Sequence, residues 1–224
     1  MPAPAPESEP AIVRALGLPI ESMVMSMTTA SSALPATLLD RLTVSSPVAH
    51  MLAVAGVATA TAVASQVSVP LPFTPVPLTL QPMVVLLGGA MLGARLGAAS
   101  QCLYLMAGIA GLPVFALSGD LSMGLLRLVG PTGGYLMAYP LAAALVGALA
   151  SRGLDRRVSG AVLAMLAGLA VIFAGGVAWL AKDLGVSTAL TLGLYPFVLV
   201  DVLKIAAAST LLPAAWRLLG HRAE

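Results

Sequence analysis

Two oppositely charged side chains, Asp201 and Lys204, lie within a long apolar stretch near the C-terminal end of the chain. Residues three apart share one face of a helix, so the carboxylate and the ammonium are expected about one turn apart. A lone charge inside a membrane costs roughly 2.5–3.5 kcal/mol on insertion scales, so such residues face a protein interior or a cavity. The pair therefore predicts a polar pocket in which Asp201 accepts hydrogen bonds from N–H groups and Lys204 binds an anion. An ion pair that only neutralises itself is the structural alternative.

A glycine-rich segment, Gly-Pro-Thr-Gly-Gly-Tyr at residues 130–135, opens another apolar run. Proline suits the first turn of a helix, and glycines let a ligand or another helix approach the backbone closely. Free N–H groups at a helix N-terminus favour a carboxylate or a carbonyl oxygen. The candidate ligand-binding residues here are Thr132, Gly133, Gly134 and Tyr135. A turn that packs against a neighbouring helix explains the segment equally well.

Five prolines between residues 70 and 82 interrupt a third apolar stretch. Each proline removes a backbone donor and pushes the preceding residue to extended geometry, so residues 69–81 cannot continue a helix. Non-helical backbone at membrane depth is tolerated only where it is buried in protein or lines a cavity. Two polar residues, Thr79 and Gln81, end this segment and are candidates for the pocket. Capping of the next helix is the alternative for both, and it is the favoured one for Thr79.

The composition of the 224-residue chain identifies the environment in which these residues act. Hydrophobic residues make up 59% and charged residues only 9%, with a mean hydropathy of +0.99, whereas soluble domains carry about 25% charged residues. This excludes a soluble globular domain, a disordered chain, a nucleic-acid-binding protein and a disulfide-stapled secreted scaffold. Cys102 has no second cysteine with which to pair. The chain is predicted to be an integral protein of the lipid bilayer.

Runs without charged residues predict an all-α membrane protein with six transmembrane helices. The predicted helices cover residues 48–68, 82–94, 96–113, 128–151, 158–181 and 184–216, with an extended outer segment at 69–81. The predicted domains are a mostly disordered cytoplasmic tail at 1–44, a six-helix membrane domain at 45–217 and a cytoplasmic C-terminal tail at 218–224. The first tail lacks the basic start and uninterrupted apolar core of a signal peptide.

The distribution of basic residues orients the predicted helices, because lysine and arginine in short loops stay on the cytoplasmic side. With both termini cytoplasmic, seven arginines fall on that side: Arg41, Arg95, Arg152, Arg156, Arg157, Arg217 and Arg222. The outer face then keeps Arg127 and Lys182, next to Asp120 and Asp183. The proline-rich segment at 69–81 and the glycine-rich segment at 130–135 are therefore both expected on the outer side.

Four motifs carry a resemblance to a known family: VPLPFTPVPLTLQ at residues 69–81, GLPVF at 111–115, GPTGGYL at 130–136 and DVLK at 201–204. Their content and order are similar to the BioY family, the biotin-specific substrate-capture (S) component of energy-coupling factor (ECF) transporters. The resemblance spans roughly residues 48–215 and leaves out the N-terminal tail. Arg127 departs from it, since small or apolar residues are expected ahead of the glycine motif.

The resemblance implies that the ligand is biotin, which has a ureido ring, a thioether ring and an acid tail. Asp201 would accept the ureido N–H groups, Lys204 would meet the carboxylate or the carbonyl, and Gln81 would bond the ureido edge. The implied pocket opens outward and is closed by the loops between helices one and two and between helices three and four. Apolar or aromatic walls would come from Tyr135, Tyr104 and Phe73, although core packing explains Tyr104 equally well.

The chain contains no phosphate-binding loop of the G-x-x-x-x-G-K-[ST] type, so we do not expect it to hydrolyse ATP. The resemblance implies that a transmembrane coupling subunit and two ATPase subunits drive transport. In this family the coupling subunit docks on an Ala-x-x-x-Ala motif of the first helix, and Ala58 and Ala62 fit by position. Small residues at this spacing let two helices approach closely. Packing within the chain is the alternative, because alanine is common throughout the sequence.

Other functional classes lack the residues that they require. The two histidines, His50 and His221, lie at predicted membrane edges, which disfavours histidine-based catalysis within a span. A metal transporter would need clustered His, Cys or acidic ligands, and a channel would need polar positions repeated along several helices. We therefore expect no catalytic residue, no metal and no cofactor, in a multi-pass protein of the cell membrane. A solitary biotin transporter that works without an ATPase module remains the alternative.

Overall fold

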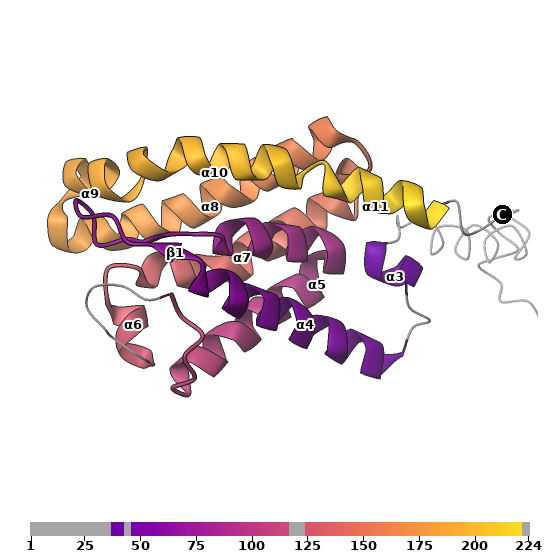
Figure 1. Ribbon diagram of the computed structural model, residues 1–224, viewed down its shortest axis with the longest axis horizontal. Helices are drawn as coiled ribbons and strands as arrows, with labels where there is room; N and C mark the ends of the chain where they lie inside the picture. The colour runs from indigo at the N-terminus through magenta and orange to yellow at the C-terminus, as the bar shows by residue number, and fades with distance from the viewer. Residues whose placement is uncertain (1–36, 43–45, 117–123, 221–224) are drawn as a thin grey trace, which may run out of the picture. The chain divides into compact units, whose positions relative to one another are not determined.

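A computed structural model describes residues 37–42, 46–116 and 124–220, which all belong to one unit, residues 36–224. This part of the chain is mostly helical, as predicted, and includes one antiparallel hairpin of two short strands (Figure 1). The elements in chain order are α3 (Leu38–Leu42), α4 (Pro47–Gln66), β1 (Ser68–Val69), β2 (Leu78–Thr79), α5 (Gln81–Ile109), α6 (Leu125–Val129), α7 (Gly133–Ala150), the 3₁₀ helix η1 (Leu154–Arg156), α8 (Val158–Leu184), α9 (Val186–Gly193), α10 (Tyr195–Ala208) and α11 (Leu211–Gly220).

Within the described residues, five helical stretches are long and apolar enough to cross a membrane. They are Pro47–Gln66, Gln81–Ile109, Gly133–Ala150, Val158–Leu184 and Tyr195–Leu218. These stretches coincide with the uncharged runs from which the sequence predicts six helices. The difference in number arises in α5, where two of the predicted helices are joined.

Helix α5 is interrupted at Gly93, where the backbone leaves helical geometry with φ 81° and ψ 177°. A Cβ atom added at Gly97 would lie 2.9 Å from the Cα atom of Gly89, whereas eight residues of straight helix extend about 12 Å. The chain therefore folds back on itself at Gly93, near the end of the helix predicted at 82–94 and two residues before Arg95, where the sequence places the turn. A positive φ of this size is accessible mainly to glycine, which fixes the turn at this residue.

Two other predicted helices differ from the structure in their bounds. The helix predicted at 128–151 begins only at Gly133, because a turn at residues 130–132 separates it from the short helix α6. The helix predicted at 184–216 is divided into α9, α10 and α11. Leu194 has non-helical geometry before Pro196 in the first turn of α10. Pro213 cannot donate the backbone hydrogen bond that would continue α10 into α11.

Helix α7 lies in the centre of the core and packs against α5 on one side and α8 on the other. Ala142, Ala143 and Val146 of α7 are completely buried. A Cβ atom added at Gly147 would collide with the backbone of α5 at Gly93. In lipid, where packing rather than the hydrophobic effect joins helices, small residues allow such close approach. Close packing on both sides thus fixes the position of α7 relative to α5 and α8.

The helix α3 falls within the segment predicted as an N-terminal tail. Its Leu38 and Leu39 are 1% and 7% exposed, and the helix contacts α5 and α11. Asp40 caps the start of α3 by accepting the backbone N–H and the hydroxyl of Thr37 over 3.0 and 2.9 Å. Outside the described residues lie 1–36, 43–45, 117–123 and 221–224, which include Asp120, His221, Arg222, nearly all of the predicted N-terminal tail and part of the C-terminal one.

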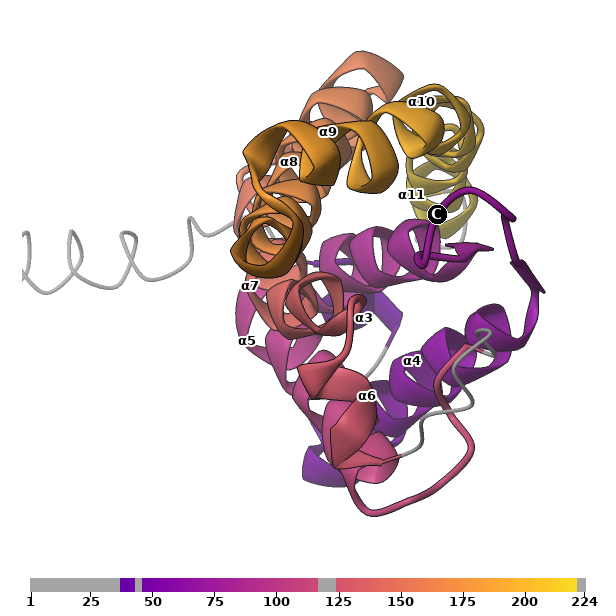
Figure 2. The ribbon, with the colours of Figure 1, turned by 90° about the vertical axis from the view of Figure 1, so that its left-hand side faces the viewer.

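The opposite end of the membrane unit from α3 carries the hairpin, α6 and α9 (Figure 1). In the hairpin Ser68 pairs with Thr79 and Val69 with Leu78, so the proline-rich segment is non-helical, as predicted. The Thr74 hydroxyl at the tip donates to the carbonyl oxygen of Leu192 in α9 over 2.7 Å. Figure 2 looks onto this end and shows the hairpin running from α4 toward α10 before the chain enters α5.

Candidate binding site

A cavity lies between the hairpin, the start of α5 and helices α7, α8 and α10. It contains about 580 Å³ of space between its lining atoms, including its mouth. The apolar lining comes from Val76, Pro77, Leu78, Pro82, Ala116, Leu136, Ile172, Phe173 and Phe197, and the polar lining from Thr79, Gln81, Arg127, Thr132, Tyr135, Tyr139 and Asp201. Mostly apolar walls with a few convergent polar groups are typical of small-molecule sites. The described residues include no group of three or more His, Cys, Asp or Glu side chains that could hold a metal ion.

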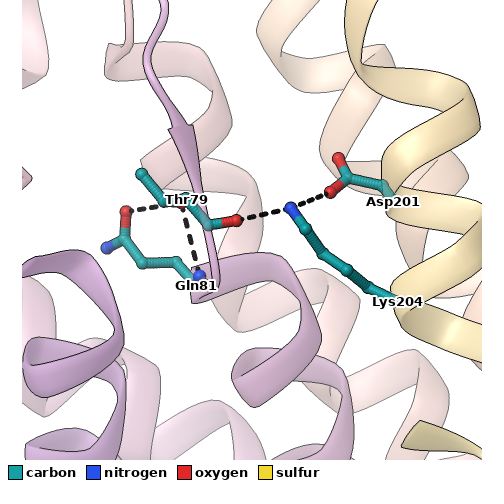
Figure 3. A network of polar contacts seen from close by, with 4 residues as sticks. All are labelled: Thr79, Gln81, Asp201 and Lys204. Carbon is teal, nitrogen blue, oxygen red and sulfur yellow. Dashed lines mark hydrogen bonds and ion pairs between the residues drawn. The ribbon is translucent and has the colours of Figure 1, made fainter. Parts of the chain in front are cut away.

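Asp201 reaches the cavity from the second turn of α10 and is 5% exposed. Lys204 Nζ donates to Asp201 Oδ1 over 2.8 Å and to the carbonyl oxygen of Thr79 over 2.7 Å (Figure 3). Lys204 thus joins α10 to β2 and does not itself line the cavity. In the described part of the chain Asp201 Oδ2 has no hydrogen-bond donor, so it can accept one from a ligand. The ion pair that the sequence offered as the structural alternative is present, and Asp201 lines a cavity, whereas Lys204, predicted to bind an anion there, does not line it.

Gln81 lines the cavity and is fixed by its neighbours. The Thr79 hydroxyl donates to Gln81 Oε1 over 3.3 Å and accepts the backbone N–H of Gln81, the first residue of α5, at the same distance (Figure 3). Gln81 Nε2 donates to the hydroxyl of Tyr104, which donates in turn to the carbonyl oxygen of Val114 over 3.1 Å. Tyr104 is 1% exposed and packs edge-on against Phe115. It therefore belongs to the core behind Gln81 and does not line the cavity.

The glycine-rich segment divides into residues that face the cavity and residues that face protein. Thr132 and Tyr135 line the cavity. Thr132 Oγ1 is buried and has no hydrogen-bond partner among the described residues, whereas the Tyr135 hydroxyl donates to the carbonyl oxygen of Gly193 over 2.7 Å. A Cβ atom added at Gly133 would collide with the carbonyl group of Leu128, and one added at Gly134 would collide with α8. The two glycines thus allow close packing, the alternative that the sequence left open.

Arg127 and Phe73 lie differently from what the sequence predicts. Arg127 is only 3% exposed and lines the cavity, although its position suggested a charge on the outer surface. Its Nη2 atom donates to the carbonyl oxygen of Ala116 over 2.8 Å, which orients the guanidinium. Phe73, a predicted wall of the pocket, is 58% exposed in the hairpin loop and is not part of the cavity lining. The cavity thus has a buried cation near Ala116 that the spacing of motifs did not reveal.

Sequence reasoning missed several further residues of the cavity. Phe197, Ile172 and Phe173 supply apolar walls from α10 and α8. Tyr139 lines the cavity from α7 and is 4% exposed. Its position four residues after Tyr135 could have identified it, because residues four apart share one helix face.

The predicted docking residues Ala58 and Ala62 face the interior of the chain. Ala58 is 7% exposed and belongs to the hydrophobic core, and Ala62 is partly buried against that core. The outward face of α4 carries other residues, namely Ala55, Thr59, Ala60 and Val63. The position of Ala58 and Ala62 in the structure agrees with the alternative of packing within the chain.

A second buried carboxylate, Asp155, lies outside the membrane-spanning segments, in the connection between α7 and α8. It is 2% exposed, and its Oδ2 atom accepts a 2.6 Å hydrogen bond from Trp216 Nε1 of α11. The Arg156 guanidinium lies 5.0 Å from the centre of the Trp216 ring. Burial raises the pKa of Asp155 above its ordinary value of 3.8, because a charged carboxylate loses solvation there, while the Trp216 hydrogen bond opposes the shift.

Comparisons with known proteins agree with this geometry. A profile of the BioY family matches residues 27–221. The probable biotin transporter BioY of Pyrococcus horikoshii is 42% identical over 148 residues, which cover 66% of this chain and 84% of that protein. The biotin transporter BioY of Thermotoga maritima is 36% identical over 140 residues, which cover 62% and 80%. The crystal structure of the S-component for biotin from an ECF-type ABC transporter matches 76% of this chain and 92% of that one at 24% sequence identity, and its TM-score of 0.68 indicates a shared fold.

Proposed function

The chain belongs to the BioY family, and we propose on this premise that it captures biotin as the substrate-binding subunit of an ECF transporter in the cell membrane. Relatives that match most of its membrane part are named biotin transporters, and a protein of the same fold is the S-component for biotin of such a transporter. BioY is a family of transporters and not of enzymes. Chemical change of the ligand is therefore not part of the proposed function.

The membrane topology belongs to the same proposal. The two halves of α5, before and after Gly93, count as separate spans and raise the number of crossings to six. Both termini are cytoplasmic, since the arginines at Arg95, Arg152, Arg156, Arg157 and Arg217 then lie on the cytoplasmic side. The cavity consequently opens toward the outer face, from which the ligand arrives.

The observation that supports biotin most directly is Asp201 Oδ2, an acceptor in a mostly apolar cavity that receives no hydrogen bond from the described residues. A ureido ring offers two N–H donors to an acceptor of this kind, and the thioether ring and alkyl tail match apolar walls. Arg127 lines the cavity, and its positive charge would attract the acid tail of the ligand. Lys204 orients Asp201 and holds β2 over the site, and Gln81, Thr132 and Tyr135 complete the polar lining.

Equilibrium binding of radiolabelled biotin to the purified full chain tests the proposal. We expect saturable binding of one biotin per chain that unlabelled biotin displaces and that unrelated vitamins such as riboflavin do not. Absence of saturable biotin binding by a folded, monodisperse preparation would contradict the proposed function.

Partner subunits form the second part of the proposal: a transmembrane coupling subunit and two ATPase subunits. The lipid-exposed face of α4 around Ala60 is the proposed docking surface, because its small residues allow a second helix to approach closely. Uptake of biotin into proteoliposomes, measured with and without an ECF coupling module, tests the requirement. We expect uptake only with the module and ATP. Uptake by the chain alone would support the alternative of a solitary transporter.

A further inference from the structure

Tyr139 differs from the other buried tyrosines in its hydrogen bonding. The Tyr104 hydroxyl donates to Val114 and the Tyr135 hydroxyl donates to Gly193. Tyr139 is 4% exposed and lines the cavity, yet its hydroxyl has no hydrogen-bond partner among the described residues. Tyr139 thus presents to the cavity a hydroxyl that is available to a polar group of a ligand.

The polar groups around the cavity are unequally available to a ligand. Lys204 already donates to Thr79 and Asp201, and Gln81 bonds Tyr104 through its amide nitrogen. Within the residues that the structure describes, Asp201 Oδ2 is an acceptor without a donor. A carboxylate can take N–H groups but cannot bond a carbonyl oxygen, because it has no proton to donate. The carbonyl group of a ligand that Asp201 binds by N–H therefore needs a separate donor, and the Tyr139 hydroxyl, like that of Thr132, lines this cavity without a hydrogen-bond partner among the described residues.

We propose that Tyr139 is a specificity-determining residue that donates a hydrogen bond to the ureido carbonyl oxygen of the ligand, beside the N–H groups accepted by Asp201. The inference rests on the proposed function, since it assigns a role within the biotin site. The sequence suggested Lys204 or Gln81 for the contact with the ureido group. The inference assigns the contact with its carbonyl oxygen to the neutral hydroxyl of Tyr139 on α7. A site built to donate to a carbonyl discriminates against a ligand that lacks this acceptor, because the buried hydroxyl is then left unpaired.

The variant Tyr139→Phe tests this role, because it removes the hydroxyl and keeps the ring. The two ligands are biotin and 2-iminobiotin, in which a protonated guanidino group replaces the ureido group and offers N–H where biotin offers a carbonyl oxygen. We expect Tyr139→Phe to weaken biotin binding by about tenfold, the value of one hydrogen bond in a buried site. Binding of 2-iminobiotin should change by less than about twofold. The ratio of the affinity for biotin to that for 2-iminobiotin should therefore fall several-fold.

The matched control is Tyr195→Phe, which removes the same hydroxyl from a side chain that is 64% exposed and outside the cavity. It should leave the affinity for both ligands unchanged. The thermal midpoint of the ligand-free chain, measured for all three proteins, reports any effect on folding.

Two results for Tyr139→Phe would overturn the inference while the proposed function stands. The first is unchanged biotin affinity. The second is an equal loss for biotin and 2-iminobiotin, which would show that the hydroxyl does not distinguish a carbonyl acceptor from an N–H donor. Failure of the unmodified chain to bind biotin is a separate result, which would remove the proposed function and the role of Tyr139 together.

Discussion

The two oxygen atoms of Asp201 have different surroundings, and the difference suits the residue to bind a ligand. Oδ1 accepts the ammonium of Lys204, which also bonds the Thr79 carbonyl, so the carboxyl group is held in one orientation. Oδ2 has no donor in the described part of the chain. A charged acceptor fixed in advance forms stronger hydrogen bonds than a neutral one and loses little freedom when the ligand binds.

The substitution Asp201→Asn should weaken biotin binding at least tenfold, or about 1.4 kcal/mol or more. Asparagine keeps the shape but replaces one acceptor oxygen with an N–H₂ donor and leaves the Lys204 ammonium without its counter-charge. Equilibrium binding to the purified variant measures the effect. Asp183→Asn, at an exposed carboxylate outside the cavity, is the control and should bind normally. Unchanged affinity of a folded Asp201→Asn variant would exclude Asp201 from the site.

At the scale of residues, local motifs predicted part of the site and tertiary packing decided the rest. Asp201 and Tyr135 could be identified because a charge in a span and a glycine-rich helix start are visible in a few consecutive residues. The cavity-facing positions of Arg127 and Tyr139 depend on how α6 and α7 rotate against their neighbours. The same rotation turns Gly134 toward α8 and leaves it out of the cavity. The spacing of residues along the sequence does not show how α6 and α7 are rotated against their neighbours.

At the scale of elements, the contact between α7 and α8 depends on the absence of a side chain at Gly134. A Cβ atom at this residue would collide with Trp179 and with the backbone carbonyl of Gly175. Trp179 is itself held by its indole N–H, which donates to the carbonyl oxygen of Gly130 over 3.1 Å. Neither neighbour can move without disturbing the start of α7, which positions Thr132 and Tyr135 in the cavity.

We expect Gly134→Ala to destabilise the chain by about 1–3 kcal/mol, the usual cost of overpacking, and to weaken biotin binding because α7 is displaced. Thermal unfolding in detergent and equilibrium binding are the measurements. Gly56→Ala is the matched control, since an added Cβ there has nothing within 4 Å. Equal stability of the two variants would contradict the tight α7–α8 contact.

Asp155 joins η1 to α11 and makes the stability of this contact depend on pH. Because burial raises the folded-state pKa above 3.8, the folded chain binds a proton more readily than the unfolded chain in the range between these two pKa values. The contribution of Asp155 to stability is therefore greatest at low pH and falls as pH rises through that range. Asp155→Asn removes the titration but keeps an acceptor for Trp216.

Thermal midpoints of the unmodified chain and of Asp155→Asn, followed from about pH 4 to pH 8, test this expectation. The unmodified chain should lose stability relative to the variant as the pH rises. A constant difference across the range would show that Asp155 has the same proton affinity in the folded and unfolded chain.

The helices themselves were the most predictable elements, because runs without charge are long and the membrane requires a regular backbone. Their interruptions were less predictable. Gly93 is one of 22 glycines, and only the packing of both halves of α5 against α7 selects it for the reversal. Leu194 carries no signal of its own for the break between α9 and α10, which depends on the neighbouring Pro196 and on the contact between α8 and α9.

At the scale of the whole molecule, one face of α4 packs within the chain, and another face is proposed to pack against a partner subunit. Ala58 lies in the core, whereas Ala60 lies on the outward face. Leucine at residue 58 would overfill the core. Leucine at residue 60 would instead hold a partner helix at a greater distance and forfeit close contact.

Ala58→Leu is therefore expected to lower biotin binding and uptake together. Ala60→Leu should preserve binding by the isolated chain while reducing co-purification with an ECF coupling module and ATP-dependent uptake several-fold. Ala170→Leu, on the exposed surface of α8, is the control and should change none of these quantities. Normal coupling in Ala60→Leu would place the docking surface elsewhere.

The reversal of α5 at Gly93 also has a consequence for the biogenesis of the protein. The first half, residues 81–92, extends only about 18 Å at 1.5 Å per residue, less than the roughly 30 Å of a hydrocarbon core. This half is too short to be retained across a bilayer by its own apolar surface while the ribosome is still synthesising the second half. The two halves are therefore expected to enter the membrane as one hairpin, only after residues up to Ile109 have emerged. A side chain at Gly93 would thus impair insertion before any pocket could form.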